Sequence, residues 1–281
     1  MTEIYAYYKA VKDDGGFREI GKQTLEQHIS KAIKFLNEEI KNTKIWKYYV
    51  SLSNEEIIDK WMKVAVILHD IGKIFYQENF KFLKEWRYLN FVGHEFLSTY
   101  LVDKFLNAWL EEDIESRIEE YKSFRWIVCG SILYHHHAMG LRGRERLYKI
   151  ATCKNENEFN GILSKVLDII QKYLPEFGDD VTQKFINDIK VLRPTKLINY
   201  TKLYLTGDLL SEIYRYVDEI NEEIWRNFVK SGEFGKKMIL STNILIMADY
   251  RGSEERGEIR TKFGEVVDES IKLYREILSL P

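Results

Sequence analysis

The chain has 281 residues, of which 45% are hydrophobic, so a substantial core can form in one large domain. Its net charge of −2 at pH 7 excludes a globally basic surface, and a nucleic-acid partner would therefore need a local basic patch. The two cysteines, Cys129 and Cys153, are too few for a disulfide framework and fit a reducing compartment. Because the sequence has no signal-peptide pattern and no long apolar run, we expect a cytoplasmic protein without membrane contact.

Helical periodicity dominates the chain. Long stretches with a 3.6-residue hydrophobic period, together with only three prolines, predict a nearly all-α protein organised as a single domain over residues 1–281. The first helix is expected after the capping box from Thr24 to Gln27, and its inward face carries His28.

The second predicted helix follows another capping box, from Ser53 to Glu56. Its apolar face leads to His69 and Asp70 in the last turn, and Gly72 is expected to end it.

Two more helices carry the remaining histidines. One is expected over residues 91–105 with His94 near its start, and the next over residues 114–133 ends just before three consecutive histidines. The four helices should therefore bring their polar residues to one region. Beyond them, residues 152–159 are expected to form a polar connection, and further helices are predicted near residues 162–173, 181–191, 201–228, 239–250 and 263–278.

All six histidines fall in four short segments, at His28, His69, His94 and His135 to His137. Neutral imidazole is a common ligand of transition metals, and a carboxylate next to it can bridge two ions. The pair His69-Asp70 with remote histidines therefore suits a mononuclear or dinuclear hydrolytic centre, for which water attack on a phosphoester is the first chemistry to expect. Taken singly, His28 and His94 would more often be satisfied core histidines, and it is their place in the ordered set that favours ligation.

A late carboxylate should complete the ligand set. Asp249 follows the apolar run over residues 244–248 and is favoured, whereas Asp208 has similar flanks and remains the rival. Lys73, three residues after Asp70, either neutralises a phosphate oxygen or is a solvated cation favoured by a helix C-terminus.

The order of these residues carries a family resemblance. His28, the segment His-Asp-Ile-Gly-Lys from His69 to Lys73, His94, His135-His136 and a late aspartate together resemble the HD superfamily of metal-dependent phosphohydrolases. Lys73 and the segment from Ala248 to Ser253 make the chain most similar to the stand-alone HD nuclease subunit of type I CRISPR interference, the double-prime form.

The resemblance covers about residues 22–255 and implies an HD-domain helical bundle. The long gap between the consecutive histidines and Asp249 implies one or two helices inserted before the last ligand motif. An apolar Ile132 three positions before His135 fits the superfamily's usual approach to the site, which favours His135 and His136 as ligands and leaves His137 as a substrate contact or outer-shell residue.

The family's ligand sets can be carried over to this chain. One metal ion would be held by His28, His69, Asp70 and Asp249. A second would be held by Asp70, His94, His135 and His136, with Asp70 bridging. Mixed imidazole and carboxylate ligation suits Mn, Fe, Co, Ni or Zn better than Mg, which prefers oxygen ligands, and the sequence does not choose among them.

The resemblance also implies a substrate and partners. It predicts cleavage of single-stranded DNA, with RNA as a second candidate, in antiviral defence. The chain has no motor of its own: residues 16–23 nearly spell a phosphate-binding loop, but Gln23 stands where a serine or threonine should bind magnesium. A separate CRISPR helicase subunit and an RNA-guided surveillance complex are therefore the expected partners.

Cations and aromatic residues could guide such a substrate. Arg142, Arg144, Arg146 and Lys149 follow the histidines and could track a phosphate backbone, although a solvated loop explains them equally well. Four aromatic residues, Tyr134, Tyr148, Trp126 and Trp86, are candidates for base stacking, although the helical spacing of Trp126 favours a core position. Two other functions stay open at this point: an HD phosphohydrolase acting on nucleotides or other small phosphoesters, and a non-catalytic scaffold held together by its metals.

Overall fold

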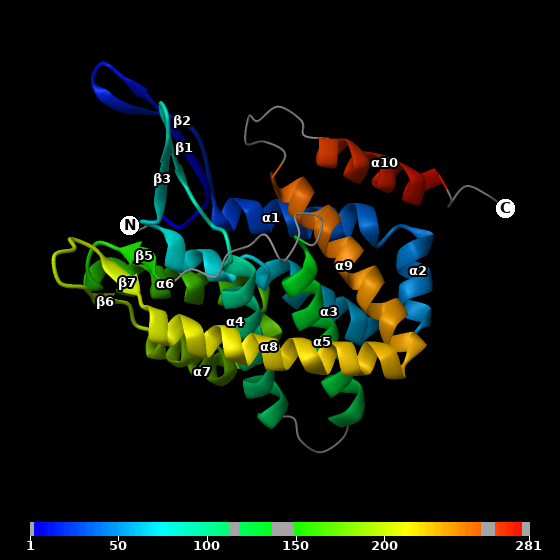
Figure 1. The fold of residues 1–281 in the computed structure, drawn as a ribbon. Coiled ribbons are helices and arrows are strands. Elements are labelled where there is room, and N and C mark those ends of the chain that lie inside the picture. Colours follow the sequence, from blue (N-terminus) through cyan, green and yellow to red (C-terminus); the bar gives the residue numbers. More distant parts are fainter. Residues whose placement is uncertain (1–2, 113–117, 137–148, 254–261, 277–281) are drawn as a thin grey trace.

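The computed structural model describes residues 3–112, 118–136, 149–253 and 262–276, and consists of a helical body from which a β-sheet projects (Figure 1). Its long helices are α1 (Leu25–Phe35), α2 (Lys44–Ser51), α3 (Glu55–Leu68), α4 (His94–Glu112), α5 (Ile118–Tyr134), α6 (Glu156–Tyr173), α7 (Gly178–Val191), α8 (Gly207–Lys230), α9 (Gly232–Ser253) and α10 (Lys262–Glu276). Shorter turns are the π-helix η1 (Leu36–Ile40) and the 3₁₀ helices η2 (Ile71–Tyr76) and η5 (Pro175–Phe177). The predicted helical fold class is confirmed.

Local capping explains where the first helices begin. The Thr24 side chain accepts a hydrogen bond from Gln27 N while the Gln27 side chain accepts one from Thr24 N, so the predicted capping box is present. The start of α3 differs from the prediction, because Asn54 rather than Ser53 is the N-cap and accepts from the N–H groups of Glu56 and Ile57.

Two small antiparallel sheets were not predicted. The first, in the order β2-β1-β4-β3, contains β1 (Tyr5–Asp13), β2 (Gly16–Thr24), β3 (Phe80–Leu83) and β4 (Trp86–Leu89). The second, in the order β5-β7-β6, contains β5 (Ile150–Cys153), β6 (Thr195–Lys196) and β7 (Leu203–Leu205).

These strands agree with the rejection of a phosphate-binding loop and correct two other expectations. The segment that resembles a phosphate-binding loop is strand β2, paired along its length with β1. The expected connection over residues 152–159 contains the end of β5 and the start of α6, and the helix expected from residue 201 begins only at Gly207 because β7 precedes it.

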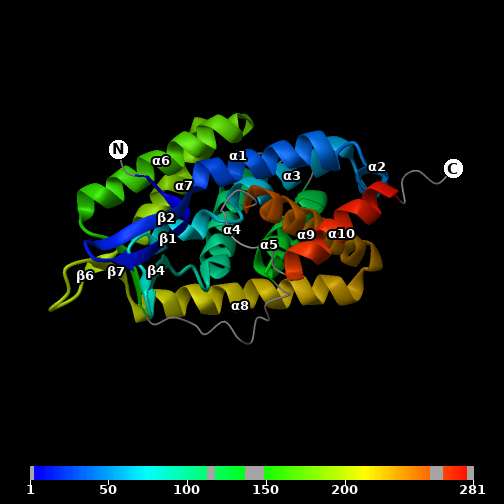
Figure 2. The same ribbon diagram turned by 90° about the horizontal axis from the view of Figure 1, so that it is seen from above.

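The helices that carry the histidines are held together by large apolar side chains. The Trp61 ring on α3 stacks on Phe124 of α5 at 6.0 Å and meets Trp109 of α4 edge-on at 5.4 Å, and all three are buried. Aromatic pairs of this kind add about 0.5–1.5 kcal/mol each beyond the burial of their area. Figure 2 shows α3, α4, α5 and α9 between α8 on one side and α1 with α6 on the other.

Among the described helices, none combines the length and the apolar character that crossing a bilayer requires.

Gly72 lets the turn after α3 approach α4 closely. A Cβ atom at this position would lie 2.3 Å from the carbonyl oxygen of His94 and 2.7 Å from the backbone nitrogen of Ser98. The Gly72 N–H donates to the Ser98 hydroxyl at 2.9 Å. The glycine after the His-Asp pair is therefore required by packing, and it does not end the helix: α3 ends at Leu68 and η2 continues through Gly72.

We expect Gly72→Ala to lower the free energy of unfolding by about 1–3 kcal/mol, because the clashing atoms belong to the backbone of α4 and cannot move aside as a side chain would. The measurement is the midpoint of urea denaturation. Gly232→Ala is the control, since nothing lies within 4 Å of a Cβ atom there, and it should change stability by less than about 0.5 kcal/mol. Equal midpoints for the two variants would contradict the close approach.

Candidate metal centre

The sequence-predicted ligands come together at one place from five separate elements. His28 lies on α1, His69 and Asp70 directly after α3, His94 at the start of α4, His135 and His136 directly after α5, and Asp249 near the end of α9. They form two groups in which one ligand atom of every residue lies within 4.8 Å of the others: His28, His69, Asp70 and Asp249, and Asp70, His94, His135 and His136. Asp70 belongs to both groups.

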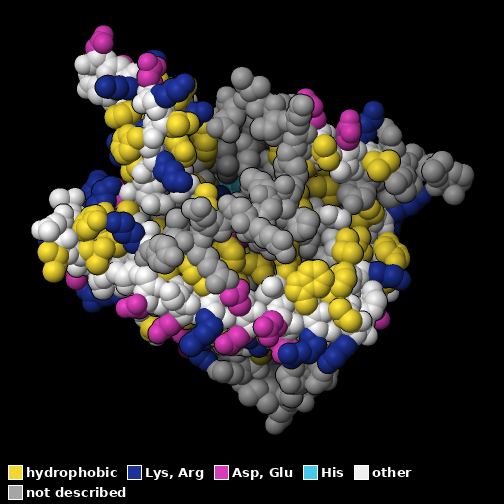
Figure 3. Space-filling model, viewed as in Figure 1, with side chains coloured by type: hydrophobic (Ala, Val, Ile, Leu, Met, Phe, Trp, Pro, Cys, Tyr) yellow, Lys and Arg dark blue, Asp and Glu magenta, His cyan; other side chains and the backbone are white. Residues whose placement is uncertain are grey.

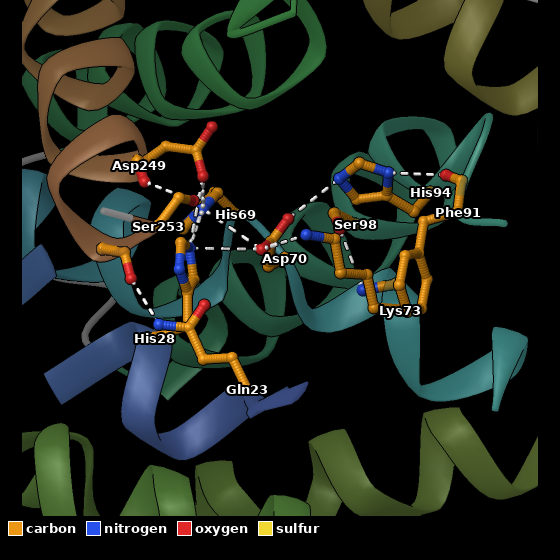
Figure 4. Close-up of polar contacts among 12 residues, drawn as sticks. Gln23, His28, His69, Asp70, Lys73, Phe91, His94, Ser98, Asp249 and Ser253 are labelled. Carbon is orange, nitrogen blue, oxygen red and sulfur yellow. Dashed lines mark hydrogen bonds and ion pairs between the residues drawn. The ribbon is translucent and has the colours of Figure 1, made fainter. Parts of the chain in front are cut away.

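The first group brings ring nitrogens and carboxylate oxygens close together (Figure 4). His28 Nε2 lies 3.2 Å from His69 Nε2, 3.3 Å from Asp70 Oδ2 and 3.2 Å from Asp249 Oδ1. His69 Nε2 lies 3.5 Å from the same two carboxylate oxygens. Such crowding of potential ligand atoms is stable when a proton or a cation sits among them.

In the second group, a histidine faces the other oxygen of Asp70. His94 Nε2 lies 2.9 Å from Asp70 Oδ1. The His94 ring is 5.1 Å from that of His136 and 5.7 Å from that of His135, centroid to centroid. The two oxygens of one carboxylate thus face two sets of histidines, which is the arrangement expected of a bridging ligand.

Backbone carbonyls fix the tautomers of three histidines. The Nδ1 atoms of His69, His94 and His135 lie 2.8, 2.7 and 2.6 Å from the carbonyl oxygens of Val66, Phe91 and Ile132, each three residues earlier in the chain. A carbonyl can only accept, so Nδ1 carries a proton, and each of these imidazoles presents an Nε2 lone pair to the centre when it is neutral.

The buried Nε2 atoms provide a test of whether a metal fits. Those of His94 and His135 have no hydrogen-bond donor, and neither has the buried Oδ1 of Asp70 that His94 faces at 2.9 Å. Two acceptors at this distance repel each other unless a cation lies between or beside them. The donor set of imidazole nitrogens and carboxylate oxygens therefore fits one or two divalent transition metal ions.

Both carboxylates of the centre are held in the ionised form. Burial alone would raise the pKa of Asp70, but the Lys73 ammonium, 2.5 Å from Oδ2, and the neighbouring histidines hold that pKa well below its usual range. Burial acts on Asp249 in the same direction and is outweighed by hydrogen bonds from His28 and His69, so its pKa is also lowered.

The pKa values of His135 and His69 are shifted in opposite directions. Burial, followed by the charge of His69, lowers the pKa of His135 to about 3, so this imidazole is neutral and able to coordinate at physiological pH. Burial also lowers the pKa of His69, but Asp70 and Asp249 outweigh it and the net shift is upward. In the protein without metal, a proton on His69 thus partly supplies the positive charge that the carboxylates require.

Lys73 is not the solvated cation that one interpretation of the sequence expected. The whole residue is only 5% exposed, and its ammonium contacts Asp70 and lies 5.3 Å from the ring centroid of Phe91. Its contact with a phosphate oxygen stays a prediction.

The structure also separates the rival ligands. Asp249 lies in the centre, whereas Asp208 is exposed at the start of α8 and belongs to neither group. His137, Arg142, Arg144, Arg146 and Tyr148 lie outside the described residues. Lys149 is described, and its ammonium donates to the Tyr200 hydroxyl at 2.7 Å.

Several contacts that shape the centre were missed from the sequence. The Gln23 side chain donates to the Gly252 carbonyl at 2.6 Å, and Gly252 packs so closely on His28 that a Cβ atom there would lie 2.6 Å from the ring. Nothing in the sequence distinguished Gln23. The carbonyl contacts had a usable signal, since an apolar or aromatic residue precedes each of the three histidines by three positions.

Comparisons with known proteins agree with this geometry at the level of the domain. Residues 49–156 match the family model of the HD domain, which confirms the HD resemblance and supports a metal-dependent phosphohydrolase. That range holds His69, Asp70, His94, His135 and His136, whereas His28 and Asp249 lie on either side of it.

The chain was also compared with curated proteins and with solved structures. No curated protein matches the sequence. Among solved structures, the chain is similar to the CRISPR-associated Cas3 HD domain protein from Methanocaldococcus jannaschii, with 21% identity and a TM-score of 0.39, over 81% of this chain and 95% of that chain.

We expect Asp70→Asn to weaken the binding of both ions and Asp249→Asn that of one, because the amide removes the charge and one ligand oxygen. Replacing residues that merely orient ligands costs about 10–100-fold in metal affinity, so the loss of a ligand should cost at least as much. The measurement is the metal content of each variant after equilibrium dialysis against micromolar Mn²⁺.

Asp208→Asn is the matched control for the metal-content measurement. It removes an exposed carboxylate outside both groups and should leave the metal content unchanged. Loss of metal from Asp208→Asn with full retention in Asp249→Asn would reverse the assignment of the late ligand.

Proposed function

We propose that this chain, whose residues 49–156 match the HD domain, is a metal-dependent nuclease that cleaves single-stranded DNA. The observation that carries the proposal is the pair of ligand groups that share Asp70, because one buried carboxylate between two sets of imidazoles is suited to a two-metal hydrolytic centre. RNA contains the same phosphodiester linkage and is a second candidate substrate.

The residues would divide the binding of two ions between them. His28, His69, Asp70 and Asp249 would hold one ion, and Asp70, His94, His135 and His136 the other. When bound, such ions supply an activated hydroxide and stabilise the leaving oxygen of the phosphodiester.

The chain itself contributes preorganisation. The carbonyls of Val66, Phe91 and Ile132 fix three imidazoles before any ion binds, so little rearrangement accompanies binding. Lys73 keeps Asp70 ionised and holds its Oδ2, which leaves Oδ1 facing His94. A phosphate entering the centre would also meet the positive charge of Lys73, which favours the charge that develops on its oxygens.

The setting of this activity rests on the ordered motifs from His28 to Asp249. Their resemblance to the stand-alone nuclease of type I CRISPR interference supports a role in antiviral defence. It also supports two partners that this chain would need in order to act on duplex DNA, a separate helicase subunit and an RNA-guided surveillance complex.

The test of the nuclease is cleavage of end-labelled single-stranded DNA by metal-stripped protein resupplied with Mn²⁺. We expect cleavage only with metal, no hydrolysis of a mononucleotide, and a rate at least about 10²-fold lower for Asp70→Ala, because the shared ligand is lost. Asp208→Asn should cut at the wild-type rate. Intact DNA with a hydrolysed mononucleotide would instead identify a phosphohydrolase of small molecules. A melting temperature of the protein that depends on metal, with neither substrate hydrolysed, would identify a scaffold.

A separate prediction concerns Lys73. We expect Lys73→Gln to lower the single-turnover cleavage rate at saturating Mn²⁺ by about 10²-fold, the usual cost of removing one group that stabilises developing charge. Lys73→Arg keeps the charge and should recover part of the loss. A wild-type rate for Lys73→Gln would show that this lysine serves folding alone.

A further inference from the structure

The projecting sheet has two faces, one of which is linked to the metal centre. Directly paired residues of antiparallel strands point to the same face. On one face of the sheet, β1 contributes Tyr7, Lys9 and Val11, which pair with Gln23, Gly21 and Arg18 of β2. Lys9 and Val11 also pair with Tyr88 and Trp86 of β4. These two residues pair in turn with Lys81 and Leu83 of β3. We call this surface the basic aromatic face and define it by Tyr7, Lys9, Arg18, Lys81, Trp86 and Tyr88.

The opposite face also carries cations and aromatic rings. The register places Lys12, Lys22 and Arg87 there, together with Tyr8, Phe17 and Phe82, and Glu19 lies 3.4 Å from Lys22. There the Arg87 guanidinium lies 3.8 Å from the ring centroid of Phe80, and Phe17 and Phe82 pack edge to face at 5.8 Å. Phe82 is 65% exposed and Phe17 39%.

The basic aromatic face adjoins the metal centre. Gln23 lies on this face by its pairing with Tyr7, and its amide reaches the Gly252 carbonyl, directly against His28. The base of β1 is joined to the other side of the centre, because Tyr5 N donates to the Gln77 side chain and that amide donates to the carbonyl of Lys73. The sheet therefore rises beside the elements that carry the ligands, and β2 runs directly into α1 (Figure 1).

The charges of this face suit a polyanion. Lys9 Nζ lies 4.7 Å from the ring centroid of Trp86, which is 38% exposed, and Lys81 is exposed on the neighbouring strand. Among the residues of the four strands, the register places one acidic residue on this face, Asp13 near the tip of the hairpin. Its Oδ2 lies 4.0 Å from Nε of Arg18. Figure 3 shows hydrophobic and basic side chains gathered on the projecting sheet.

A single strand of nucleic acid matches these features better than a protein partner does. Exposed aromatic rings stack on bases of any sequence, and adjacent cations neutralise the phosphates between them. The basic aromatic face is also the one that continues through Gln23 to the metal centre, which favours it as the path of a substrate.

We propose that the basic aromatic face binds single-stranded nucleic acid and leads it to the metal centre, with Trp86 stacking on a base and Arg18 and Lys81 facing phosphates. The inference rests on the proposed nuclease function and adds to it the path of the substrate.

The test is the affinity of the full-length protein for a fluorescein-labelled thymidine 20-mer, measured by anisotropy in EDTA so that binding is observed without cleavage. Trp86→Ala should weaken the affinity about 5- to 100-fold, the effect of losing one stacked base. Lys81→Ala should lower the slope of log affinity against log salt by about 0.7, the value for one phosphate contact of a single strand. Phe82→Ala, on the opposite face, is the matched control and should keep the wild-type affinity.

Two measurements, DNA binding and phosphodiester hydrolysis, distinguish a wrong substrate path from a wrong function. If Trp86→Ala and Lys81→Ala bind as the wild type does, or if Phe82→Ala weakens binding as much as Trp86→Ala, the inference is overturned. Lys81 is exposed, so its variant tests the face even if Trp86→Ala unfolds. A wild-type protein that does not bind the 20-mer but hydrolyses bis(4-nitrophenyl) phosphate with Mn²⁺ would contradict the proposed substrate path and would still be a phosphodiesterase. A wild-type protein that neither binds the 20-mer nor hydrolyses this compound would contradict the proposed function as well.

Discussion

The structure depends on one buried anion. Asp70 is a carboxylate with no exposed surface, and an isolated charge in such a place is too costly to keep. Lys73 supplies one compensating charge at Oδ2, and the imidazoles around both oxygens accept either protons or metal ions. Because these groups lie on α1, α4 and α9 or directly after α3 and α5, the charge of a single side chain is compensated by residues of five separate elements.

The packing around Asp70 serves the same requirement. The absence of a side chain at Gly72 lets η2 touch α4, and the absence of one at Gly252 lets α9 touch His28. The stacked Trp61 and Phe124 fix α3 against α5 one layer deeper. Close backbone approach and aromatic packing thus set the positions of the ligands, and the carbonyl contacts set their orientations.

Much of this arrangement could be predicted because its signals are local. Periodicity located the helices, the box at Thr24 marked the start of α1, and the order of histidines and aspartates identified the groups that the fold brings together. Choosing Asn54 over Ser53 as a cap depends on the dihedral angles of the chain, which sequence does not specify. Strands β3 and β4 were missed because they have only four residues each and because the pairing of Lys9 with Tyr88 spans residues far apart in sequence. The hairpin of β1 and β2 did have a local signal, the Asp14-Gly15 turn between two strands of nine residues, and the prediction overlooked it.

The projecting sheet is joined to the body through its base, where Gln23 and Gln77 bind backbone carbonyls beside the metal centre. Its far end is a turn at Asp14 and Gly15, where all neighbouring residues are exposed. The length of the projecting hairpin and the geometry of the metal centre can therefore vary independently in this fold. Insertions at the turn could lengthen the hairpin while the amides at its base keep their partners, so evolution or design could vary how far the arm extends without altering the spacing of the ligands.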